Sequence, residues 1–329
     1  MLKRLLTRAA RKRAGFHRAA TVRERTPRLL LCGLLAVGIA AAQDTAKDED
    51  AKNRIVLEVS RVNLLFTVAD KKGRFVTDLG KEDFEITEAK KPQQILEFTA
   101  ESNLPLRLAI LVDTSNSIRD RFRFQQEAAV EFVNSVMRPH ADKAVLVSFD
   151  MTAELVTDLT NDTERLAKAI RDLRPGGGTA MYDAIYFACR DKLMQDQPRD
   201  KFRRAMVVLS DGDDNVSRYT REQALEMAQK ADVVIYTIST NYTSQQTDGD
   251  KVMKYFAAQT GGLAFFPFKV QDLAQSFENI ANELRHQYNV LYRPDPLKQD
   301  GLWHPIDLRV KGRKDLIVRA RKGYLAPKI

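Results

Sequence analysis

The stretch LAILVDTSNS, Leu108–Ser117, places an apolar run directly before a polar turn. Five consecutive apolar residues are typical of a strand that is buried on both faces, as in the parallel sheet of an α/β protein. The run stops at Asp113, and Ser115 and Ser117 follow at alternate positions. Because the strand ends in carboxylate and hydroxyl oxygens, the stretch predicts a binding site at the end of this strand.

The same rhythm of apolar run and helical segment continues along the middle of the chain. Ala128, Phe132 and Val136 share one face of a helix, which we expect to begin just after Ser117. The spacings Asn161 to Glu164 and Thr220 to Gln223 are those of helix capping boxes. The further apolar runs cover residues 144–149, 205–210, 233–238 and 263–268. Strands without strict alternation, interleaved with helices, predict a doubly wound α/β domain with a mostly parallel sheet over residues 104–287.

Both flanks of this domain have the pattern of β-strands. Residues 54–102 alternate apolar and polar side chains around turns, and residues 288–329 contain three more short strands. Neither flank alone has enough strands for an independent core. We therefore expect the two flanks to pack together as one small β-sandwich, into which the α/β domain is inserted.

The N-terminus has the sequence pattern of an export signal. Basic residues up to Arg28 precede the apolar run Leu29–Ala42, which ends in the A-x-A pattern of a cleavage site. This run is shorter than the about 20 residues of a membrane-spanning helix, so no permanent span is expected after cleavage, although an uncleaved signal anchor stays open. The prediction is a signal peptide over residues 1–42, a flexible leader over 43–53, and an exported protein of the periplasm, the cell surface or the medium.

The net positive charge of the chain lies in this predicted signal. Ten of the 53 Lys and Arg residues and one of the 44 acids fall within residues 1–42, so the remainder carries 43 of each and is neutral. A neutral chain has no basic field for phosphates, and no nucleic-acid partner is expected. Cys189 is the single cysteine after cleavage, which excludes an intramolecular disulfide, and its helical spacing from Met181 and Ile185 predicts a core position.

Polar residues from three loops are predicted to meet at one edge of the sheet. Asp113, Ser115 and Ser117 follow the first strand, Asp211 follows the run at residues 205–210, and Thr179 follows a glycine run between them. In an open α/β sheet, ligands bind outside the carboxyl ends of the strands. Hydroxyl and carboxylate oxygens without Cys or His favour a hard divalent cation, with Mg²⁺ first and Mn²⁺ or Ca²⁺ as alternatives.

The D-x-S-x-S stretch at Asp113, the threonine after the glycine run and the Asp in Ser210-Asp211-Gly212 resemble the metal-ion-dependent adhesion site of von Willebrand factor type A domains. The resemblance covers roughly residues 104–283. The flanking segments DKKGRFVTDLGKEDFEI and RARKGYLAP resemble the von Willebrand A-related proteins of acidobacteria. The resemblance implies a doubly wound fold and a module that binds other proteins.

The resemblance also implies a role for each matching residue. Ser115 and Ser117 would bind the ion directly, Asp113 and Asp211 directly or through water, and Thr179 in one of two states. Two carboxylates leave the bound ion without excess negative charge. The implied partner is a protein that offers an Asp or Glu carboxylate as the last ligand.

Two other classes of function compete with this interpretation. One is a structural component of an envelope assembly, in which the metal only stabilises the fold. The other is a metal-assisted hydrolase, which would need a base near the motif. After the signal only His140, His286 and His304 remain, without metal-ligand spacing, and neither G-x-S-x-G nor H-E-x-x-H occurs. We therefore expect a binding protein and not an enzyme.

Overall fold

The computed structural model describes residues 61–327 except for 101–103, 198–200, 242–244 and 268–269. The signal peptide at residues 1–42 and the leader at 43–53 lie outside the described residues and stay predictions. Within the described part of the chain, no helix is both long and apolar enough to cross a membrane.

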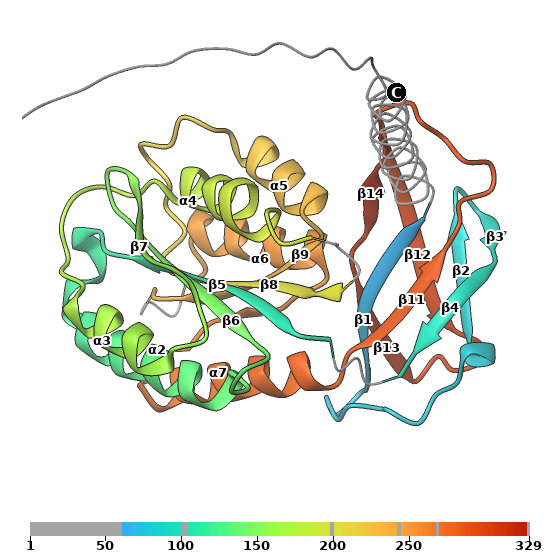
Figure 1. Ribbon diagram of the computed structural model, residues 1–329, viewed down its shortest axis with the longest axis horizontal. Helices are drawn as coiled ribbons and strands as arrows, with labels where there is room; N and C mark the ends of the chain where they lie inside the picture. Colours follow the sequence, from blue (N-terminus) through green and yellow to red (C-terminus); the bar gives the residue numbers. More distant parts are fainter. Residues whose placement is uncertain (1–60, 101–103, 198–200, 242–244, 268–269, 328–329) are drawn as a thin grey trace, which may run out of the picture. The chain divides into compact units, whose positions relative to one another are not determined.

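The middle of the chain forms a six-stranded sheet in the order β10-β9-β8-β5-β6-β7 (Figure 1). The strands are β5 (Leu106–Asp113), β6 (Lys143–Phe149), β7 (Ala153–Thr160), β8 (Arg203–Ser210), β9 (Val233–Ser239) and β10 (Ala264–Phe265). All neighbouring pairs are parallel except β6 and β7, which are antiparallel. The carboxyl ends of β5, β6, β8 and β9 therefore share one edge of the sheet.

Helices cover both faces of this sheet. They are α2 (Phe122–Val136), α3 (Thr163–Asp172), α4 (Met181–Phe187), α5 (Arg221–Lys230), α6 (Asp248–Thr260) and α7 (Val270–Arg285). Figure 1 shows α2, α3 and α7 on one face and α4, α5 and α6 on the other. Successive residues of β5 enter two different cores, since Ile110 packs with α2 and α7 while Leu111 packs with α4 and α5. The predicted doubly wound, mostly parallel α/β fold is confirmed.

Details at the starts of helices differ from the sequence-based expectations. The capping box at Thr220 is confirmed, because Thr220 Oγ1 accepts the Gln223 N–H and the Gln223 side chain accepts the Thr220 N–H. The box at Asn161 is wrong by one residue, since Asp162 caps α3 by accepting the Arg165 N–H. Ser117 itself lies within a 3₁₀ helix, η2 (Asn116–Arg121), and α2 begins only at Phe122.

Two antiparallel four-stranded sheets combine segments from before and after the α/β region. Their orders are β13-β1-β11-β4 and β14-β12-β2-β3. The strands are β1 (Val62–Asp70), β2 (Phe84–Glu88), β3 (Lys91–Gln93), β4 (Ile95–Thr99), β11 (Tyr288–Tyr292), β12 (Trp303–Val310), β13 (Leu316–Ala320) and β14 (Gly323–Leu325). The short helix η1 (Lys81–Asp83) directly precedes β2, and η3 (Ala188–Leu193) follows α4 in the other sheet's region. Leu64, Phe66, Phe84 and Tyr288 lie in one apolar cluster that both sheets supply.

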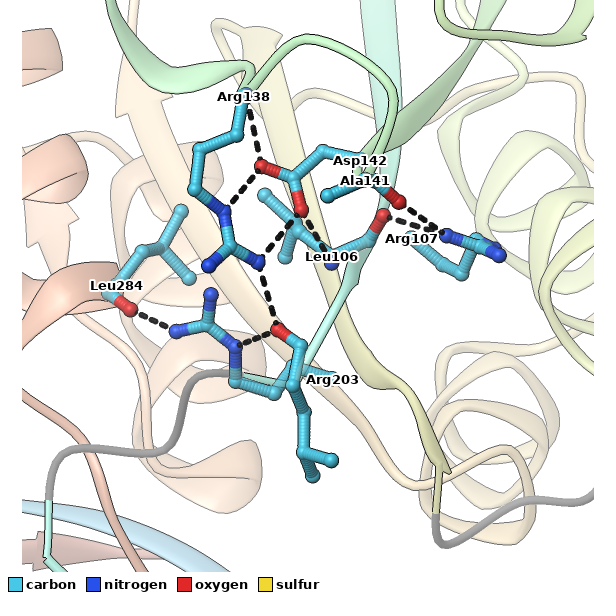
Figure 2. A network of polar contacts seen from close by, with 8 residues as sticks. Leu106, Arg107, Arg138, Ala141, Asp142, Arg203 and Leu284 are labelled. Carbon is cyan, nitrogen blue, oxygen red and sulfur yellow. Dashed lines mark hydrogen bonds and ion pairs between the residues drawn. The ribbon is translucent and has the colours of Figure 1, made fainter.

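A buried carboxylate that is paired with an arginine lies at the amino end of the central strand β5. The Asp142 side chain is 1% exposed, and its Oδ1 accepts the backbone N–H of Leu106 at 2.7 Å (Figure 2). Its Oδ2 accepts the backbone N–H and the Nε of Arg138 at 2.8 and 3.0 Å. Burial raises the pKa of Asp142, but these hydrogen bonds outweigh it and hold the pKa below its ordinary value.

Arg203 connects the two ends of the α/β region. Its guanidinium donates to the carbonyl of Leu104, where the chain enters the sheet, at 2.9 Å. It also donates to the carbonyl of Leu284, near the end of α7 (Figure 2). One buried side chain thus satisfies carbonyls from both ends of the α/β region.

Candidate metal centre

Asp113, the last residue of β5, is completely buried. Its Oδ1 accepts the backbone N–H of Ser115 at 2.8 Å, and its Oδ2 accepts the hydroxyl of Ser210 at 2.6 Å. Burial raises the pKa of Asp113 to about 6, against the hydrogen bonds from Ser210 and Ser115 and with a further rise from the charge of Asp211. Among the described residues no Lys or Arg forms a salt bridge to Asp113, so no side-chain cation offsets the charge of the ionised carboxylate.

The register of the sheet explains the contact between Asp113 and Ser210. β5 and β8 are parallel, with Val112 opposite Leu209, so that Asp113 and Ser210 come next on their two strands. Ser210 Oγ also accepts the backbone N–H of Gly212 at 3.0 Å. The hydroxyl therefore joins the buried carboxylate to the turn that follows β8.

The two serines of the motif connect Asp113 to Asp211 through hydrogen bonds. Ser115 is buried and immediately precedes η2, and its Oγ lies 2.9 Å from the Oγ of Ser117. Ser117 is exposed and donates to Asp211 Oδ2 at 2.6 Å. Asp113, Ser115, Ser117 and Asp211 thus form one continuous hydrogen-bonded series from the floor of the site to its surface.

The backbone just after Asp211 lies very close to the first turn of α6. Asp211 follows β8, and Gly212 after it has a φ of +82°. A Cβ at Gly212 would lie 2.4 Å from the carbonyl oxygen of Gly249, in the first turn of α6. Only glycine fits this position, because the conformation is left-handed and backbone atoms fill the space of a side chain.

Thr179 reaches the same edge through a loop between α3 and α4. Gly176 N–H donates to the Thr114 carbonyl at 2.5 Å, and Asn116 N–H to the Gly177 carbonyl at 3.4 Å, so this loop lies directly against the one after β5. Thr179 is 3% exposed, and its backbone N–H donates to Asn215 Oδ1 at 3.0 Å. The three predicted loops are therefore hydrogen-bonded to one another, with Thr179 tied in through its backbone.

The oxygens fit a small hard cation. Adjacent ligands of an octahedral ion with metal–oxygen distances of about 2.1 Å are about 3 Å apart. The separation of 2.9 Å between the hydroxyls of Ser115 and Ser117 has this size, and that of 2.6 Å between Ser117 and Asp211 is somewhat shorter. Within the described ranges no group of three or more His, Cys, Asp or Glu side chains could hold a metal. The donor set here would instead combine two carboxylates with hydroxyls, which suits Mg²⁺ and disfavours soft ions.

Sequence reasoning assigned no role to several residues that shape the site. Ser210 was visible beside Asp211, and only the parallel register gives its hydroxyl a partner in Asp113. Asp214 stands in an acidic loop that could suggest a second ion. Its Oδ2 instead accepts the N–H of Tyr182 at 3.0 Å and the hydroxyl of Ser217 at 2.6 Å, which makes it a structural acceptor.

The three histidines lie elsewhere in the fold, and two of them have partners there. His286 Nδ1 lies 2.6 Å from the carbonyl of Asn282, and the His286 ring stacks on Phe75. His304 lies at the start of β12, and its Nε2 is 3.0 Å from Asp300 Oδ1. His140 is exposed after α2, with a φ of +65°. None of these contacts involves a residue of the candidate site.

This fold and site define a doubly wound α/β domain with an oxygen-rich site at the carboxyl edge of its sheet. Residues 108–213 of the chain match the family described as von Willebrand factor type A domain. No curated protein matches the chain in sequence.

Several solved structures are similar in fold. The von Willebrand domain of the type V pilus tip protein Mfa5 from Porphyromonas gingivalis is 16% identical, with 55% of this chain and 95% of that one covered and a TM-score of 0.46. Proximal thread matrix protein 1 from the mussel byssus, with a zinc-occupied adhesion-site motif, is 17% identical, with 60% and 50% covered and a TM-score of 0.49.

The minor pilin PilB from Streptococcus sanguinis is 14% identical, with a TM-score of 0.45. The match covers 57% of this chain and 63% of the PilB chain, which is less than two thirds of that protein. At these identities and TM-scores the similarities carry no information about function.

Proposed function

We propose that the chain is an exported protein-binding module of the adhesion type. In this proposal Asp113, Ser115, Ser117, Thr179 and Asp211 hold a divalent cation, Mg²⁺ in the first place, with Mn²⁺ or Ca²⁺ as alternatives. The partner is a protein that presents an Asp or Glu side chain. The observation that supports it is the hydrogen-bonded series from the buried Asp113, which has no salt-bridge partner among the described residues, to the exposed Ser117.

The different burial of the site residues supports different roles for them in this proposal. Asp113 and Ser115 are buried and form the floor, whereas Ser117 is exposed and Asp211 is half-buried, on the side that a partner can reach. Ser210 and the backbone of Ser115 orient the Asp113 carboxylate, so the floor is fixed by the fold. A divalent ion held there would supply an electrophilic position that accepts a carboxylate oxygen as a further ligand.

Calorimetric titration of the full chain with Mg²⁺, Mn²⁺ and Ca²⁺ tests the ion. We expect one ion per chain in the wild type and none in Asp113→Ala. A wild type that binds none of the three ions would contradict the proposal.

Affinity capture from envelope extract tests the partner. We expect a protein that is retained by the wild type in Mg²⁺ and lost both in EDTA and with Asp113→Ala. If the ion binds and raises stability but the retained proteins are the same in EDTA, the ion is purely stabilising and the adhesive function is wrong.

The export signal over residues 1–42 has its own test. Mass spectrometry of the chain from the producing cell should find a mature N-terminus at Gln43 in the envelope or medium. An intact N-terminus in the membrane fraction would instead indicate a retained signal anchor.

A further inference from the structure

Asn215 bonds to both backbone groups of Thr179. Its side-chain Oδ1 accepts the Thr179 N–H at 3.0 Å, and its own N–H donates to the Thr179 carbonyl at 3.1 Å. The oxygen assignment is unambiguous, because a backbone N–H can only donate. Thr179 is therefore fixed against the loop that begins at Asp211, although the two residues come from separate parts of the chain.

The loop that carries Asn215 is itself fastened to the first turn of α4. Ser217 Oγ accepts the N–H of Asp183 at 3.1 Å, and Asp183 Oδ1 accepts the N–H of Tyr219 at 2.9 Å. The Tyr219 ring stacks on Tyr186 of α4, with the ring centroids 3.7 Å apart. Because α4 begins two residues after Thr179, the loop and the helix form a closed ring of contacts around Thr179.

The residue before Thr179 leaves the room that Asn215 needs. A Cβ on Gly178 would lie 3.0 Å from Asn215 Oδ1 and 3.0 Å from the sulfur of Met151. This spacing is tighter than ordinary van der Waals contact. A side chain at Gly178 would therefore press on the oxygen that accepts the Thr179 N–H.

We propose that Asn215 is a positioning residue of the ion site, which sets Thr179 relative to Asp211 before any ion binds. The inference rests on the proposed function, since it concerns the same site. Asn215 would touch neither ion nor partner, and it acts through the Thr179 backbone. A site whose oxygens are already in place loses less conformational freedom when the ion binds, and this increases affinity.

Mg²⁺ titration of four full-length proteins tests the inference. Asn215→Leu removes the acceptor at similar size, Asn215→Asp keeps it, and Arg218→Ala is the matched control, because Arg218 offers only its backbone N–H to Asp183. Loss of residues that orient metal ligands typically weakens binding about 10- to 100-fold, and we expect about tenfold for Asn215→Leu because Asn215 is exposed. Asn215→Asp should bind at least as tightly as the wild type, and Arg218→Ala equally.

Amide hydrogen exchange without ion gives a second readout. The Thr179 amide should be protected in the ion-free wild type and in Asn215→Asp, and should exchange faster in Asn215→Leu. If Asn215→Leu does not fold, Gly178→Ala replaces it and should weaken Mg²⁺ binding in the same direction. A fast-exchanging Thr179 amide in the ion-free wild type would overturn the inference without any variant.

The two proposals can fail separately. Equal Mg²⁺ affinity in the wild type, Asn215→Leu and Asn215→Asp would overturn the role of Asn215 and leave the ion site standing. A wild type that binds no ion would overturn both.

Discussion

Ser117 and Asp211 are 94 residues apart in the sequence, yet the Ser117 hydroxyl donates to Asp211 Oδ2 at 2.6 Å. The parallel arrangement of β5 and β8 produces this contact, because both strands end at the same edge of the sheet. Neither residue has a cationic side chain as a partner among the described residues. The pair therefore lies where a positive ion would be stabilised by two separate loops.

Removing the charge of Asp113 should abolish stabilisation by Mg²⁺. At an ion concentration one hundred times Kd, binding to the folded state alone adds about 2.7 kcal/mol to the free energy of unfolding. We expect calorimetry to show this rise in the wild type and in Asp307→Asn, a control on β12, and to show none in Asp113→Asn. A rise of the same size in Asp113→Asn would mean that the ion binds elsewhere.

Ser210→Ala should destabilise the ion-free protein by about 1–3 kcal/mol, because it leaves the buried Asp113 Oδ2 and the Gly212 N–H without their partner. Urea unfolding measures the change. Ser135→Ala is the matched control, since the exposed Ser135 hydroxyl bonds only to the Phe132 carbonyl of its own helix. If the two substitutions cost the same, the hydroxyl of Ser210 does not support the floor of the site.

The sequence predicts best where burial is uniform. β5 and β8 are buried along their whole length, so their apolar runs are continuous and their ends are easily recognised. β7 is an edge strand in which Val156 is only half-buried and Thr157 alone is fully buried, and its sequence AELVTDLT lacks such a run. It was missed for this physical reason, as were the short edge strands β3 and β14.

The candidate site shows the same limit at the level of single residues. Asp113, Ser115, Ser117, Thr179 and Asp211 are visible because oxygen-bearing side chains follow strands or a glycine run. The contribution of Ser210 depends on the register of β5 and β8, and that of Asn215 on its hydrogen bonds to the Thr179 backbone. Neither feature leaves a pattern in one sequence. The 3₁₀ geometry of η2 was also hidden, because the spacing of Ser117 and Phe122 does not separate a 3₁₀ from an α-helix.

Gly212→Ala should be much more costly than Gly73→Ala. Both glycines have a left-handed φ, of +82° and +79°, and this conformation costs an alanine about 1–2 kcal/mol. A Cβ at Gly73 would meet nothing within 4 Å, whereas one at Gly212 would lie 2.4 Å from the Gly249 carbonyl. We therefore expect a loss of roughly 2–5 kcal/mol for Gly212→Ala, with the overpacking added. Equal urea midpoints for the two variants would contradict this close approach.

The ion pair of Asp142 should make stability depend on pH in acid solution. Its folded-state pKa is lowered, so the stabilisation is complete above the unfolded pKa of about 3.9 and is lost as pH falls through the lower folded value. Asp142→Asn should therefore lower the free energy of unfolding at pH 7, and its difference from the wild type should shrink below about pH 3.9. Urea unfolding at a series of pH values measures both, with Asp172→Asn, on the exposed end of α3, as a control that stays near the wild type. A difference that stayed constant down to the acid unfolding of the chain would show that Arg138 and the Leu106 N–H do not favour the charged form of Asp142.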